Sequence, residues 1–163
     1  MTARLLHRML AATLPCRFMS DVSISVQVHV AAPASRVWLA LTTAAELYEW
    51  CAPGCRWEIE SLTPAATVRF YNTETDVQMA TIETVSPPRE LALRWHADPT
   101  QPGAPILNTF TLAPDGDTTV VTIVQAGYEA LPEAVRDRWL EQDRGAVAAI
   151  ARSLKAYVER AGS

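Results

Sequence analysis

The apolar residues of the C-terminal part of the chain recur at helical spacing. Within residues 132–160 they fall four or seven residues apart, at Val135, Trp139, Ala146, Ile150, Leu154 and Val158. This period predicts one long helix whose apolar face packs on a core. Pro132 suits the first helical turn and Gly162 marks the end, so a helix of roughly 43 Å should cross the domain.

The apolar face is interrupted halfway along this helix. Gln142 or Asp143 takes the place of the expected apolar residue. Gly145 also lies mid-helix, where glycine costs about 1 kcal/mol relative to alanine. A helix that is apolar at both ends and polar or small in the middle can cover a cavity as well as a solid core. The sequence does not name what would fill such a cavity.

Alternating apolar and polar residues before this helix predict strands. In the first strand, residues 22–30, every second residue is valine or isoleucine. Two short helices should follow, one opened by Pro33 and one by a capping box that begins at Thr43. About six further strands joined by tight turns indicate an antiparallel meander. This order predicts a single α+β domain over residues 21–163, with the helices on one face of the sheet.

The composition limits the classes of partner. The chain has 163 residues, of which 49% are hydrophobic and 20% charged, as in an ordinary globular domain. A net charge of −4 disfavours nucleic-acid binding, because no basic stripe is available to displace counterions. No apolar run approaches the roughly 20 residues that span a bilayer. We therefore expect no nucleic acid and no membrane among the partners, and a cytoplasmic location.

Cysteine usage fits the same compartment. An odd count of three, at Cys16, Cys51 and Cys55, suits a reducing environment. Cys51 and Cys55 straddle a turn, so a disulfide or half of a metal site is conceivable. The chain has no second cysteine pair and its histidines are scattered, which favours free thiols. We expect neither a metal nor another cofactor.

Residues 1–20 are expected to lie outside the fold. This segment carries arginines and no acidic residue, as targeting peptides do, but its apolar part is too short for a secretory signal. Three interpretations remain open. The natural start is Met19 and the preceding residues are a disordered extension, or the segment is a loosely helical tail, or it is a true targeting peptide.

Four segments together resemble a known family. They are residues 30–42 (VAAPASRVWLALT), residues 46–50 (ELYEW), residues 87–91 (PPREL) with Trp95, and residues 110–127. In this order they are similar to the START-like, or SRPBCC, superfamily, in the branch named after the activator of a heat-shock chaperone's ATPase. The resemblance implies a helix-grip fold, in which a curved antiparallel sheet of about six to seven strands wraps the long C-terminal helix.

The chain also departs from this family's pattern. Ala65-Ala66 replaces a frequent Gly-Gly, Gly145-Ala146 replaces a common Gly-Trp, and Gln125 replaces a frequent histidine. Loss of a tryptophan from a cavity-facing position leaves space that strand side chains, water or a ligand must take. We therefore expect a cavity of about 300 Å³ or more under residues 139–150.

The expected wall of this cavity is aromatic with a few polar groups. Six aromatic residues from separate elements should face inward, namely Trp50, Trp57, Phe70, Trp95, Phe110 and Trp139. Gln125, Gln142 and Asp143 would supply polar groups, beside the small Ala146. Each aromatic residue taken alone is equally well explained as core, and Asp143 as a solvated residue on a slightly rotated helix.

Three functions are compatible with these observations. No Ser-His-Asp order, paired-carboxylate motif or phosphate loop is visible, and strand parity turns His96 away from the cavity, so we predict no catalytic residue. The favoured function is binding of a small hydrophobic molecule by a monomer or homodimer. Chaperone co-regulation is implied by the family resemblance alone. An enzyme of the cyclase or hydrolase kind, as found elsewhere in the superfamily, is the third possibility.

Overall fold

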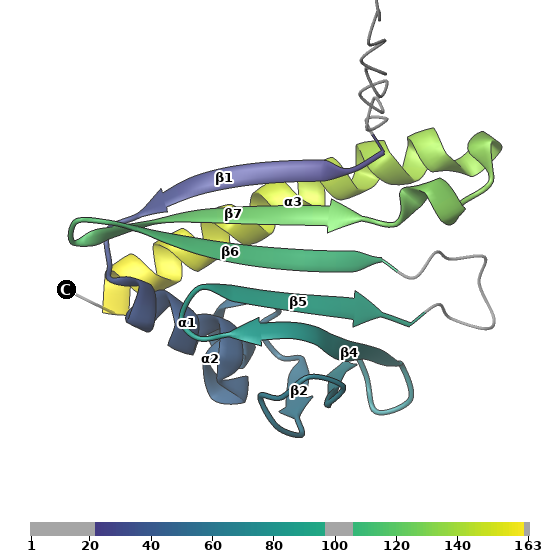
Figure 1. The fold of residues 1–163 in the computed structure, drawn as a ribbon. Helices are drawn as coiled ribbons and strands as arrows, with labels where there is room; N and C mark the ends of the chain where they lie inside the picture. Colours follow the sequence, from purple (N-terminus) through teal and green to yellow (C-terminus); the bar gives the residue numbers. More distant parts are fainter. Residues whose placement is uncertain (1–21, 97–105, 162–163) are drawn as a thin grey trace, which may run out of the picture.

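The computed structural model describes residues 22–96 and 106–161, and the interpretations of residues 1–20 and Cys16 lie outside this part of the chain. The elements run in the order β1 (Ile24–Val30), α1 (Ala34–Thr42), α2 (Ala44–Trp50), β2 (Arg56–Ile59), β3 (Thr67–Tyr71), β4 (Val77–Ser86), β5 (Glu90–Trp95), β6 (Leu107–Asp115), β7 (Thr118–Ala126), the 3₁₀ turn η1 (Tyr128–Ala130) and α3 (Glu133–Ala161). Figure 1 shows α3 lying along one side of the curved sheet. The predicted helix-grip α+β fold is confirmed.

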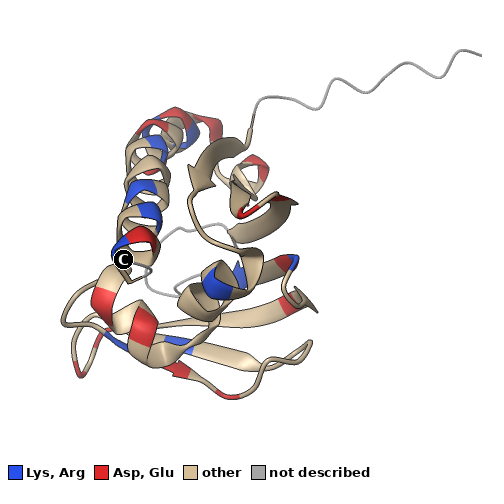
Figure 2. Ribbon diagram, turned by 90° about the vertical axis from the view of Figure 1, so that its left-hand side faces the viewer, with Lys and Arg blue, Asp and Glu red and all other residues tan. Residues whose placement is uncertain are grey.

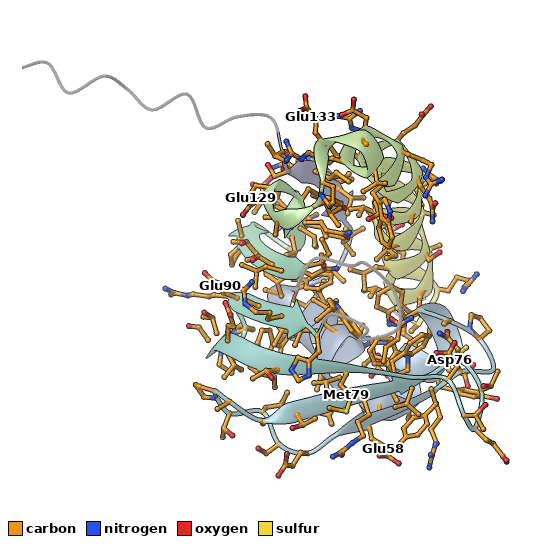
Figure 3. The ribbon with its side chains drawn as sticks, turned by 90° about the vertical axis from the view of Figure 1, so that its right-hand side faces the viewer. Glu58, Asp76, Met79, Glu90, Glu129 and Glu133 are labelled. Carbon is orange, nitrogen blue, oxygen red and sulfur yellow. The ribbon has the colours of Figure 1, made fainter. Side chains whose placement is uncertain are left out.

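The sheet is an antiparallel meander of strands β2 to β7, and β1 is added at its edge beside β7. Its order is β1-β7-β6-β5-β4-β3-β2, so each strand pairs with a sequence neighbour except β1, which crosses over to pair with β7. Val28 faces Val121 in that pairing, and α3 packs mainly against β1. The side chains of the concave face fill the space between the strands and α3 (Figure 3).

The long helix forms where the sequence predicts it, but its buried face differs from the predicted one before Leu154. The buried residues are Leu140, Val147, Ala151, Leu154 and Val158, whereas Gln142 and Ala146 are exposed. Leu154 and Val158 are buried as predicted. Earlier in the helix, Leu140 and Val147 are buried one residue after the expected Trp139 and Ala146, which displaces the buried face there by about 100°. The prediction that Gln142 and Ala146 face the interior is wrong. Figure 2 shows that the outer side of α3 carries charges of both signs.

The C-terminal half of α3 is fastened to the segment between β1 and α1. Glu159 Oε1 accepts a hydrogen bond from the backbone N–H of Ala31 at 2.8 Å, and Lys155 Nζ donates to the carbonyl oxygen of His29 at 2.7 Å. The guanidinium of Arg36 lies over the Tyr157 ring, 5.6 Å from its centroid. These contacts hold α1 against the end of α3.

The start of α2 differs from the sequence prediction. Thr43 is the N-cap residue, but its side chain makes no capping hydrogen bond. Glu46 turns instead to Arg36 on α1, with 2.6 Å between Oε2 and Nη1. The predicted capping box is therefore wrong, because an ion pair between the two short helices takes the carboxylate that the box would use.

Candidate functional site

A cavity of about 100 Å³ lies between the two short helices and the concave face of the sheet. Its wall comes from α1 and α2, from the loop after β2, from strands β2 to β6, and from one residue of α3. The lining residues are Leu41, Thr42, Leu47, Trp50, Cys51, Trp57, Ile59, Leu62, Val68, Ile82, Leu91, Leu93, Trp95, Asn108, Phe110 and Ile150. Leu62 is 39% exposed and marks where this wall reaches the surface.

The observed cavity differs from the predicted one in size and in place, so that prediction is wrong on both points. It is smaller than the expected 300 Å³ or more, and α3 contributes Ile150 alone, so it does not lie under residues 139–150. In the middle of the helix, Val147 is buried in place of the predicted Ala146. The space left by the small residues at 145 and 146 therefore opens to the outside of the helix and adds nothing to the cavity.

Four of the six predicted aromatic residues line the cavity, namely Trp50, Trp57, Trp95 and Phe110. The Trp57 ring lies 4.6 Å from that of Phe70, its register partner on β3, and 6.2 Å from that of Trp95 in an edge-to-face arrangement. The indole N–H of Trp50 donates to the carbonyl oxygen of Ala40 at 2.9 Å, which fixes the Trp50 ring. Tilted and edge-to-face pairs of this kind are the favoured aromatic contacts.

Phe70 and Trp139 are outside the lining. Phe70 packs beside Trp57 as its register partner on β3, and Trp139 is partly buried against the core in the first half of α3. The residues predicted to supply polar groups are also outside the lining. Gln125 and Asp143 hydrogen-bond to each other elsewhere, and Gln142 is exposed, as is the small Ala146.

Two polar atoms of lining residues are buried without a partner. Neither the Trp57 indole N–H nor Asn108 Oδ1 has a hydrogen-bond partner among the described residues. Sequence analysis missed Asn108, although its parity with Phe110 and Leu112 on β6 was a usable signal. The third polar residue of the wall, Thr42, donates its hydroxyl to the carbonyl oxygen of Trp38 at 2.7 Å.

A separate hydrogen-bonded cluster joins β7, η1 and the middle of α3. Tyr128 donates its hydroxyl to Asp143 Oδ2 at 2.7 Å. Gln125 Nε2 donates to the same carboxylate oxygen at 3.0 Å and to the Tyr128 hydroxyl at 2.6 Å. This cluster explains the polar position in the buried face of α3. Tyr128, which sequence analysis missed, is fully buried directly after Gly127, whose φ of 109° favours glycine and turns the chain.

Cys51 in the cavity wall and Tyr128 in the hydrogen-bonded cluster both have a raised pKa. Burial, and next the neighbouring Cys55, raises the pKa of Cys51 to about 11, so its thiol stays protonated at neutral pH. Burial also raises the pKa of Tyr128 above its ordinary range, and the hydrogen bond to Asp143 acts in the same direction. Cys51 and Cys55 are free thiols, and across the described ranges no three His, Cys, Asp or Glu side chains gather as a metal site requires.

Strand parity placed His96 correctly on the outer face of the sheet. Its Nε2 lies 2.8 Å from Thr81 Oγ1 at an exposed position. Glu83 and Arg94 pair on the same outer face, as a surface contact between neighbouring strands.

The described part of the chain contains no helix long and apolar enough to span a membrane. The described residues that line the cavity are mostly apolar and include no charged side chain.

Comparisons with known proteins agree on the fold. The family model described as Activator of Hsp90 ATPase homolog 1-like protein matches residues 31–159. No curated protein sequence matches significantly. Protein NE0264 from Nitrosomonas europaea superposes with a TM-score of 0.69 at 14% identity, over 88% of this chain and 97% of that one.

Two further solved structures are similar. Protein MLL2253 from Mesorhizobium loti gives a TM-score of 0.68 at 19% identity, over 85% of this chain and 97% of that one. The Aha1 dimer from Colwellia psychrerythraea gives 0.66 at 14% identity, over 84% and 96%. At these identities the likeness concerns the fold.

Proposed function

This chain belongs to the family of Activator of Hsp90 ATPase homolog 1-like proteins, and from that premise we propose that it is a binding domain for a small, neutral, largely apolar molecule. The cavity between α2 and the sheet is the proposed binding site. The observation that carries this proposal is a cavity of about 100 Å³ whose described lining residues are uncharged.

The size of the cavity supports binding rather than imperfect packing. Native interiors contain few voids larger than a water molecule. Liquid water occupies about 30 Å³ per molecule, so this cavity has room for roughly three waters, yet its wall offers few polar groups to hold them. An engineered apolar cavity of about 150 Å³ in another protein stays dry and takes up benzene. The cavity here is smaller but its wall reaches the surface at Leu62, so a single benzene ring or a smaller apolar molecule is the size of compound that suits it.

The chemistry of the wall gives less support to an enzyme. Among the described residues of the lining, Cys51 is the only titratable one, and its pKa of about 11 leaves it a protonated thiol. A general base should titrate near the working pH and reach the substrate. The Asp143 carboxylate, which could serve as one, lies outside the lining in its cluster with Tyr128.

The dimeric neighbour from Colwellia is compatible with either a monomer or a homodimer of this chain. The proposed cavity is built within one chain, so binding should follow one site per chain in either state. Titration at two protein concentrations would separate stoichiometry from assembly.

Filling the cavity is the test of the proposal. Ile150 lines the cavity, whereas Ala146, one turn earlier on α3, is exposed. Ile150→Trp should therefore abolish binding of benzene, measured by calorimetry. Ala146→Trp is the matched control and should bind as the wild type does. Thermal melting would establish that both variants are folded.

Two results would overturn the proposal. In the first, the wild-type chain binds no apolar compound of benzene size. In the second, Ala146→Trp and Ile150→Trp reduce binding equally, which would place the binding site somewhere other than this cavity.

A further inference from the structure

Leu62 is the most exposed residue of the cavity wall. It is 39% exposed, whereas each of the other described lining residues is buried or half-buried. Single exposed leucines are ordinary on protein surfaces and need no explanation by themselves. Leu62 differs from them because it also forms part of the wall of an interior cavity. It therefore lies where the cavity meets the solvent.

The backbone on both sides of Leu62 is fixed to the sheet. Leu62 lies on the loop between β2 and β3. Before it, the N–H of Glu60 donates to the carbonyl oxygen of Thr67 on β3 at 3.1 Å. After it, the N–H of Ala65 donates to the carbonyl oxygen of Ile82 on β4 at 2.8 Å. Since both ends of the loop are held, the side chain at position 62 limits the mouth of the cavity.

The rest of the wall leaves less room for a larger ligand. Val68 on β3 and Ile82 on β4 are 3% and 1% exposed and belong to the main core. Trp57 is packed against two other aromatic rings, at 4.6 and 6.2 Å between centroids. Protein interiors are close-packed, so moving such residues disturbs the core around them. Ligand atoms at Leu62 would instead displace solvent.

The volume of the cavity makes this position decisive. The cavity holds about 100 Å³, less than the roughly 150 Å³ of an engineered cavity that takes up benzene. A single ring therefore fills the interior, and any substituent on that ring has to point toward the mouth. Leu62 occupies the mouth, so its size decides how much of the substituent is buried.

We propose that Leu62 is the specificity-determining residue that limits the ligand to a single apolar ring without a large substituent. This inference rests on the function proposed above. Alanine at position 62 lacks three side-chain carbon atoms of leucine, whereas an ethyl substituent on a ring adds two. A shorter side chain should therefore extend the cavity toward the solvent and admit the larger compound.

Benzene and ethylbenzene are the probes that test this limit, because they differ only by the ethyl group. Their dissociation constants would be measured by calorimetry with the full chain. In Leu62→Ala, the preference for ethylbenzene relative to benzene should rise about tenfold over the wild type, since burial of two further carbon atoms contributes about that factor. Comparing this ratio between proteins cancels the different water solubilities of the probes.

Three more variants complete the design. Leu62→Val removes one carbon atom, so it should raise the ratio by less than Leu62→Ala, and it gives a second reading if Leu62→Ala does not fold. Leu39→Ala is the matched control, because Leu39 on α1 is 51% exposed and outside the lining, and it should leave the ratio unchanged. Ile150→Trp added to Leu62→Ala should abolish binding of ethylbenzene, which would locate this compound in the cavity.

The outcomes separate this inference from the proposed function. If benzene binds and neither Leu62→Ala nor Leu62→Val changes the ratio, the size limit at Leu62 is wrong while the binding function stands. An equal rise in Leu39→Ala, or ethylbenzene binding that persists after Ile150→Trp is added, would also contradict the inference. If the wild type binds neither compound, both proposals fail. A graded rise at position 62 alone is the result we expect.

Discussion

Removing the hydroxyl of Tyr128 should destabilise the protein more than removing a side-chain contact at the surface. Tyr128 is fully buried, and its hydroxyl both donates to Asp143 and accepts from Gln125. Tyr128→Phe keeps the ring and deletes these two hydrogen bonds. It leaves the Asp143 carboxylate with the Gln125 amide as its remaining partner in the cluster.

The magnitude follows from the charge of Asp143. A typical hydrogen bond contributes about 1 kcal/mol net, and one to a charged group about 1.5–3 kcal/mol. We therefore expect Tyr128→Phe to lower the free energy of unfolding by about 2–3 kcal/mol at pH 7. For a chain of this size each 1 kcal/mol shifts Tm by roughly 2–4 °C, so Tm should fall by roughly 4–12 °C.

The same substitution should change how stability depends on alkaline pH. The pKa of Tyr128 is raised in the folded protein, mainly by burial and then by the hydrogen bond to Asp143. The folded state therefore holds this proton more tightly than the unfolded state, whose tyrosine titrates near about 10. Stability from this group is fully present below that pH and is lost as pH rises above it. Tyr128→Phe should lack this part of the alkaline loss.

Urea denaturation followed by tryptophan fluorescence, at pH 7 and at several values above pH 9, measures both effects. Tyr48→Phe is the matched control, because Tyr48 is 47% exposed on α2 and should stay within about 0.5 kcal/mol of the wild type. The reasoning is refuted if Tyr128→Phe is as stable as that control at pH 7. It is also refuted if Tyr128→Phe and the wild type lose stability in parallel above pH 10.

Two further predictions concern a backbone position and a thiol. Ala65 has a φ of 68°, which costs an L-residue about 1–2 kcal/mol, so Ala65→Gly should stabilise the protein by about 0.5–1 kcal/mol in urea denaturation after the entropy of glycine is subtracted. Ala66→Gly, at a buried position without a positive φ, should destabilise it instead, and the same sign for both substitutions would contradict the argument. Cys51, with a pKa of about 11, should react with iodoacetamide at pH 8 much more slowly in the folded protein than in urea, as measured by peptide mass spectrometry. Bound ligand should slow it further, and equal rates in the folded and unfolded protein would count against a half-buried thiol in the cavity wall.

Ala65 is also one of the positions where this chain departs from its family pattern. Ala65-Ala66 stands where Gly-Gly is frequent, and Ala65 keeps the left-handed backbone that glycine would adopt without strain. The conformation persists because the Ala65 N–H donates to the carbonyl oxygen of Ile82 at 2.8 Å and the Ala66 carbonyl oxygen accepts from the Ile82 N–H at 3.0 Å. Pairing with β4 thus imposes the turn on a residue poorly suited to it.

The sequence alone determined the elements and their order. Period-2 alternation in residues 22–30 specifies a strand with one buried face, because a strand that slips by one residue exposes that face. The apolar spacing of residues 132–160 specifies a long helix, found as Glu133–Ala161. Antiparallel pairing of sequential strands follows from tight turns, and the parity of Trp57, Trp95 and Phe110 already placed these rings on the concave side.

Tertiary structure decided which face of α3 is buried and therefore where the cavity lies. A helical pattern identifies an apolar face only to within about one residue, or 100° of rotation, when alanine, valine and isoleucine surround a polar position. In the structure Val147 is buried and Ala146 is exposed, and Asp143 hydrogen-bonds to Gln125 and Tyr128. These partners lie 18 and 15 residues from Asp143 along the chain. Local spacing carries no record of such partners. The cavity wall and the unpartnered atoms of Trp57 and Asn108 depend in the same way on strands and helices that meet only after folding.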